Sequence, residues 1–215
     1  MMATVGLLWI PLGAGQHVVR ISGSVFEALS AFVQRRPACD LYHSTLVVTV
    51  PDGRYVIEMT PVPDQHGDRR GVVAGGAVGS TWLGKLRLFR YEIRCWLDGV
   101  IPDADHAVAT TTLQIDLADA QRLVDLVASV PTPVWGRDEL DGGEMWNSNS
   151  VTSWILHCGG IDTAHLAPPH GGRAPGWDAG LVIAARTSNL PHAASPPSPA
   201  SEERSTGDRT LNAGQ

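Results

Sequence analysis

Two β-branched runs on either side of a tight turn constrain this fold more than any other feature of the sequence. The runs cover residues 44–50 and 55–59, and Pro51-Asp52-Gly53-Arg54 separates them. Such runs joined by an Asp-Gly turn are typical of a β-hairpin, whose strands are antiparallel. We therefore predict an antiparallel sheet that contains this hairpin.

The length of the turn decides which side chains share a face of the hairpin. A two-residue Asp52-Gly53 loop pairs residue 47 with residue 58, and His43 and Glu58 then lie on one face. A three-residue loop separates them. The two-residue register leaves the more apolar set on the opposite face, namely Leu46, Val48, Val50, Tyr55 and Ile57.

The rest of the chain alternates short strands with amphipathic helices. We predict further strands at residues 4–12, 16–21, 86–96 and 106–113, and helices at residues 25–33, 117–129, 151–158 and 179–186. Asp116 is the expected cap of the second helix. The Gly-rich residues 61–84 are predicted to be a flap or a plain loop. These elements predict an α+β fold with a small, mostly antiparallel sheet and helices packed against it.

Composition limits the domain organisation and the partners. The chain has 215 residues and a net charge of −6, so we predict one globular domain over residues 1–186 and a disordered Ser/Pro/Ala-rich tail over 187–215. Without a Lys/Arg cluster, nucleic acid is not an expected partner. Pro11 interrupts the apolar N-terminus too early for a membrane span. Three cysteines without paired spacing indicate a reducing, cytoplasmic compartment.

A run of small polar residues leads into the third helix. Asn147, Ser148, Asn149 and Ser150 are residue types that favour the N-cap, and the pair Gly159-Gly160 is the expected stop. A hydroxyl at such an entrance lies near unpaired backbone N–H groups and the positive end of the helix dipole, which stabilise an oxyanion. The same residues also fit a capping segment with no chemistry.

One trio has predicted positions that fit nucleophilic catalysis, which needs a nucleophile, a base and an orienting group. Ser148 begins the helix, His43 opens the first hairpin strand, and Glu58 lies on the neighbouring strand. Ser150 is an alternative nucleophile. No cofactor is predicted, and no metal site either, because the acidic residues 138–144 lack calcium-loop spacing. Cys95 and Cys158 are at core-like positions, where thiols are inert.

The histidine that opens a hairpin strand, followed about a hundred residues later by Asn-x-Asn-Ser at a helix entrance, resembles the circularly permuted papain-like hydrolases, including the lecithin–retinol acyltransferase-like group. That resemblance implies a papain-like fold, His43 as base, and Ser148 at the position of the nucleophilic cysteine. Ser148 departs from the family pattern, because a serine hydroxyl stays protonated and depends wholly on general-base help. Residues 137–140 and 143–150 also resemble uncharacterised actinobacterial proteins, which implies no activity.

The resemblance implies one function, and the same residues leave a second one open. The first is a hydrolase or acyltransferase that acts on an amide, ester or thioester bond in a cleft between the Ser148 helix and the His43 hairpin. The second is a non-catalytic module that uses the same cleft for a small-molecule, lipid or peptide ligand or a protein partner. The seven tryptophans fit either an apolar cleft or a core.

Overall fold

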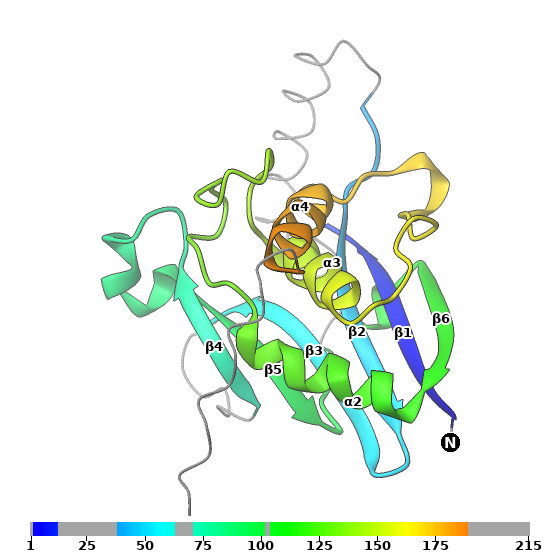
Figure 1. The fold of residues 1–215 in the computed structure, drawn as a ribbon. Helices are drawn as coiled ribbons and strands as arrows, with labels where there is room; N and C mark the ends of the chain where they lie inside the picture. Colours follow the sequence, from blue (N-terminus) through cyan, green and yellow to red (C-terminus); the bar gives the residue numbers. More distant parts are fainter. Residues whose placement is uncertain (1, 13–37, 63–70, 102–103, 189–215) are drawn as a thin grey trace, which may run out of the picture.

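The computed structural model describes residues 2–12, 38–62, 71–101 and 104–188. Within them six strands form one antiparallel sheet, in the order β4-β5-β3-β2-β1-β6. Three α-helices lie on one face of this sheet, with α3 and α4 side by side (Figure 1). The prediction of an α+β fold with a mostly antiparallel sheet is confirmed.

The elements have the following bounds in the described part of the chain. The strands are β1 Met2–Pro11, β2 Tyr42–Val50, β3 Gly53–Pro61, β4 Val72–Ala77, β5 Arg90–Leu97 and β6 Ala109–Asp116. The α-helices are α2 Leu117–Leu126, α3 Ser148–Cys158 and α4 Trp177–Ser188. Single 3-10 turns are η1 Leu83–Lys85, η2 Arg87–Phe89, η3 Ala104–His106, η4 Val127–Ser129 and η5 Pro169–Gly171.

The hairpin is present, but its register differs from the prediction. Val47 pairs with Val56 rather than with residue 58, because Pro51 and Asp52 form the turn and Gly53 already pairs with Val50. Proline at the second position and glycine at the fourth are the preferences of a type I turn. The shift is an even number of residues, so His43 and Glu58 still lie on the same face of the sheet.

The two faces of the sheet carry different clusters. The main core lies under the helices, where Leu7, Leu46 and Ile57 pack with Trp154 and Ile155 of α3. A smaller cluster of Ile10, Val56 and Ile101 lies on the opposite face. Strand alternation therefore assigns each side chain of β2 to one face or the other.

Two predicted segments differ from the structure. The Gly-rich connection contains β4, because Gly75 and Gly76 let this strand approach Tyr91 of β5: a Cβ at Gly75 would lie 2.6 Å from the Tyr91 carbonyl oxygen. Residues 86–89 form turns instead of extending β5, since Arg90 pairs with Ala77, the last residue of β4. Asp116 is at the N-cap of α2, but its side chain makes no capping hydrogen bond.

The remaining predictions fall partly outside the described residues. The strand at 16–21 and the helix at 25–33 lie there, as does the tail from residue 189. The division into a domain of residues 1–186 and a tail stays a prediction. The fourth helix continues to Ser188, two residues beyond its predicted end at 186.

Candidate functional site

The entrance of α3 is closed by a reciprocal capping box. The Asn147 side chain accepts hydrogen bonds from the backbone N–H groups of Asn149, at 2.8 Å, and Ser150, at 3.4 Å. The Ser150 hydroxyl in turn accepts from the Asn147 N–H at 3.1 Å. Two of the N–H groups that a helix leaves unpaired are thereby satisfied within the chain. The Asn147 cap occupies the position at which the oxyanion hole was expected.

Asn149 joins α3 to the sheet and to the loop before α4. Its side-chain oxygen accepts from the Ser44 hydroxyl at 2.8 Å. Its amide nitrogen donates to the carbonyl oxygens of Tyr42 and Pro175, both at 2.9 Å. Asn149 is only 2% exposed, so three polar contacts are made where water cannot replace them. This residue fixes the position of the 172–177 segment against β2.

Two further serines attach α4 to α3. The Ser150 hydroxyl donates to the Gly176 carbonyl at 2.7 Å, and the Ser153 hydroxyl donates to the Trp177 carbonyl at 2.7 Å. Gly180 lies directly against this row, and a Cβ there would clash with Ser153 Oγ. Ser150 is therefore a structural residue in this arrangement, and it fixes the start of α4.

The structure does not bring Ser148 and His43 to one face of the sheet. Ser44, the neighbour of His43 on β2, faces α3 and bonds Asn149. His43 pairs with Ile10, which belongs to the cluster on the opposite face. The thickness of the sheet separates such side chains from a helix on the other side. The Ser148 hydroxyl makes no hydrogen bond to any residue that the structure describes.

Glu58 lies on the His43 face, beside a buried arginine. Its carboxylate is 4.0 Å from the Arg94 guanidinium, and Arg94 also contacts Glu92 at 3.0 Å. Among the three sequence candidates, His43 and Glu58 therefore share one face of the sheet, and Ser148 begins the helix on the other face. This geometry gives no support to acyl transfer by Ser148.

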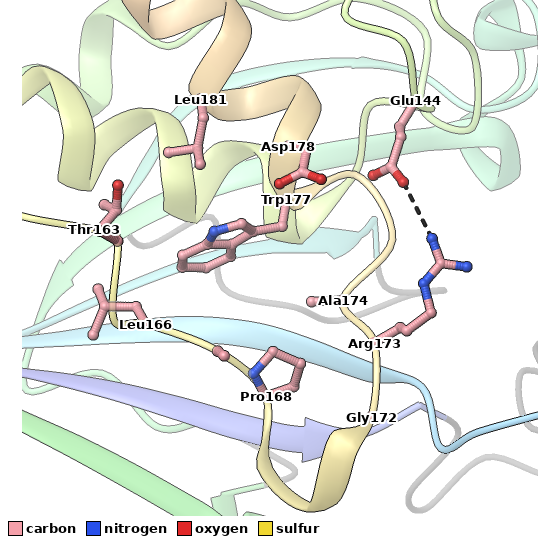
Figure 2. A pocket seen from close by; sticks show the side chains of 12 residues that line it. Glu144, Thr163, Leu166, Pro168, Gly172, Arg173, Ala174, Trp177, Asp178 and Leu181 are labelled. Carbon is pink, nitrogen blue, oxygen red and sulfur yellow. Dashed lines mark hydrogen bonds and ion pairs between the residues drawn. The ribbon is translucent and has the colours of Figure 1, made fainter.

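A cavity of about 360 Å³ lies beside the segment that Asn149 and Ser150 hold. Its apolar wall includes Trp177, Leu166 and Leu181, and its charged wall includes Glu144, Arg173 and Asp178. Figure 2 shows the Trp177 indole at the centre, with Leu181 above it and Leu166 below. Trp177 is packed against Trp9 of β1, with ring centroids 5.1 Å apart. The aromatic wall is therefore fixed to the core.

The two carboxylates of the charged wall differ in their partners. Glu144 accepts from the Gly176 N–H at 2.6 Å and contacts the Arg173 guanidinium at 3.5 Å (Figure 2). Asp178, in the first turn of α4, forms no ion pair with any described residue. Two carboxylates against one guanidinium give the cavity a negative balance, which favours a cation.

The acidic loop before α3 has mostly structural contacts. Asp138 accepts from the N–H groups of Gly142, at 2.6 Å, and Gly143, at 2.9 Å. Glu139 accepts from the Val134 N–H at 2.8 Å. Within the described residues, no group of three or more His, Cys, Asp or Glu side chains is arranged to hold a metal ion.

Two cysteines have thiols that burial makes harder to ionise. Burial, with a smaller contribution from Asp125, raises the pKa of Cys95 to about 11. Burial also raises the pKa of Cys158, and a hydrogen bond with Ser188 partly opposes this. A nucleophilic cysteine needs a lowered pKa. Neither thiol has the electrostatic environment of a nucleophile.

The residues that line this cavity are not among the candidates that the sequence predicts. Trp177 and Asp178 directly precede the helix predicted at residues 179–186, and no role is predicted for Arg173. One signal was present: an aromatic residue followed by an acidic one ends a long Gly/Pro-rich segment, over residues 168–178. The sequence does not show that this segment contacts Glu144, which lies about thirty residues earlier in the chain.

Comparison of the chain with protein-family models, curated proteins and solved structures gives no match. The papain-like topology and its catalytic residues therefore stay predictions. No helix in the described residues has both the length and the apolar content needed to cross a membrane.

Proposed function

We propose that this protein is a non-catalytic binding module whose cavity beside Trp177 takes a basic side chain of a peptide or protein partner. The observation that carries the proposal is the pairing of a fixed aromatic wall with the Asp178 carboxylate in one cavity. A lysine or arginine has an apolar stem and a charged end. The two parts match the two walls.

The contacts available to such a side chain are specific. The stem would pack on Trp177, Leu166 and Leu181, and the cationic end would reach Asp178. A cation near an indole face gains further attraction from the ring electrons. Glu144 is already occupied by the Gly176 N–H and Arg173, so Asp178 is the expected ion-pair partner.

The cavity also lacks a serine or cysteine nucleophile paired with a histidine, which the predicted acyl transfer would need. Among the described residues that line it, none is serine, cysteine or histidine. The Asn-Ser-Asn-Ser run lies behind the cavity wall, where it supplies hydrogen bonds to the 172–177 segment. These facts support binding over acyl transfer.

Isothermal titration calorimetry with three short blocked peptides tests this function. The peptides carry lysine, norleucine or glutamate at one central position in an alanine background. We expect the lysine peptide to bind best. Because Asp178 is exposed, Asp178→Asn should weaken this binding about fivefold, which corresponds to an exposed ion pair of about 1 kcal/mol. Asp119→Asn, a carboxylate in the first turn of α2, is the matched control and should change nothing.

Equal binding of the lysine and norleucine peptides would show that the positive charge of the side chain does not contribute to the affinity. Equal affinity of Asp178→Asn and the parent protein would place the cation elsewhere. Leu181→Ser tests the apolar wall, with the exposed Val182→Ser on the same helix as its control.

A further inference from the structure

An exposed apolar and cationic projection lies between β4 and β5, far from the cavity beside Trp177. It consists of residues 80–89, which include the turns η1 and η2, together with Arg90, the first residue of β5. Figure 1 shows it at the left end of the molecule, beyond the edge strand β4 and away from α3 and α4. We refer to residues 80–90 as the projection.

The projection exposes large apolar side chains that the fold does not use. Trp82 is 70% exposed, Leu86 55% and Leu88 66%. Single exposed apolar residues are common, but three within seven positions, one of them tryptophan, form a patch of the kind that marks an interaction surface. The patch lies on the turns η1 and η2 and the residues that flank them.

The projection is also positively charged in an otherwise acidic protein. It carries Lys85, Arg87 and Arg90, and residues 71–91 contain no Asp or Glu, although the whole chain has a net charge of −6. Lys85 and Arg90 form no ion pair with any described residue. The cations alternate with the exposed leucines over residues 85–88.

A second cavity lies at the base of the projection. It has a volume of about 360 Å³ and is lined by all three cations, together with Tyr91 and Glu92. The Glu92 carboxylate is already engaged by Arg94 at 3.0 Å. Cations around a small hollow next to exposed apolar side chains fit an anionic headgroup with its acyl chains close by.

The base of the projection is held firmly. The Val78 N–H donates to the Phe89 carbonyl at 2.8 Å, and the Gly79 N–H donates to the Trp135 carbonyl at 3.0 Å. The Arg137 side chain donates to the Gly79 carbonyl. Because the turns are bonded to the body of the protein, the exposed side chains are presented in a defined arrangement.

We propose that the projection docks the protein on an anionic lipid surface, with Trp82, Leu86 and Leu88 at the headgroup–acyl boundary and Lys85 and Arg90 against the headgroups. Tryptophan favours this boundary, leucine gains from burial there, and each cation gains from the negative surface potential. An acidic protein groove would match the charge but would not require a protruding tryptophan. The docking is independent of the cavity beside Trp177.

Vesicle co-sedimentation of the full chain tests the proposal. The vesicles are either wholly zwitterionic or contain about a third phosphatidylglycerol. We expect binding to the anionic vesicles only, with Trp82→Ser and Lys85→Glu each lowering the partition coefficient roughly tenfold. Val100→Ser, another strongly exposed apolar residue, and Arg122→Glu, an exposed cation on α2, are the matched controls and should bind like the parent.

Three results would overturn the proposal. The first is absence of co-sedimentation by a protein whose circular dichroism shows it to be folded. The second is equal binding to both vesicle types together with no effect of Lys85→Glu. The third is a concentration-dependent dimer that Trp82→Ser abolishes without vesicles, since the patch would then join two copies of the chain.

Discussion

Replacement of Asn149 by alanine tests the structural role of the α3 entrance. The substitution removes three hydrogen bonds, to the Ser44 hydroxyl and to the carbonyl oxygens of Tyr42 and Pro175. Each neutral bond contributes about 1 kcal/mol net, and a buried group that loses its partner costs about 1–3 kcal/mol. Pro175 keeps a second donor, Asn147, at 2.8 Å, so we expect a loss of about 3 kcal/mol in the free energy of unfolding.

Equilibrium urea unfolding followed by tryptophan fluorescence measures this loss. Ser148→Ala is the matched control one residue away. Ser148 is also buried, at 7% exposed, but its hydroxyl makes no hydrogen bond to a described residue, so its effect should stay within about 1 kcal/mol. A loss of less than about 1 kcal/mol for Asn149→Ala would refute the proposed network. So would an equally large loss for Ser148→Ala.

Three further substitutions or conditions have expected outcomes. Gly180→Ala should lower the thermal midpoint much more than Val182→Ala does, because the added methyl group would meet helix α3. Arg94→Ala should cost about 3 kcal/mol in urea unfolding by leaving carboxylates poorly solvated, whereas Arg122→Ala, in an exposed pair, should cost under about 1 kcal/mol. With its pKa raised from 9.0 to about 11, the Cys95 thiol should react with a disulfide reagent at pH 8 roughly a hundredfold more slowly than a free thiol.

The pH dependence of Cys95 has a defined sign. Folding favours the protonated thiol, so this contribution to stability is complete below pH 9 and is lost as the pH rises toward 11. Three results would contradict the packing described. They are labelling of Cys95 at pH 8 as fast as that of a free thiol, an unchanged thermal midpoint for Gly180→Ala, and equal losses of unfolding free energy for Arg94→Ala and Arg122→Ala.

Short-range sequence patterns predicted the elements that depend on interactions between residues close together in the sequence. The capping residues before Val151 and the helical apolar spacing after it predicted α3, and the structure has the cap at Asn147. The hairpin was also predicted, but its turn was placed one residue late. Pro51 at the second turn position was the stronger signal, and Gly53 serves a close approach to Leu97 instead, at 2.5 Å from a Cβ built there.

Features that depend on distant residues were not predictable in this way. Gly75 and Gly76 indicate a loop when they are considered alone, yet they permit a strand because Tyr91 lies beside them. The face of His43 was unknown until its pairing with Ile10 was known. The cavity depends on where Glu144 meets the 172–177 segment, and no local pattern specifies that meeting.

Backbone ¹H–¹⁵N NMR during titration with the lysine peptide tests the central claim most directly, because it locates the ligand. We expect progressive shifts of the Asp178 and Leu181 amide resonances and no shift of the His43 resonance. Shifts confined to His43 and Ser148, or none at saturating peptide, would contradict the assignment of the binding site to the cavity beside Trp177.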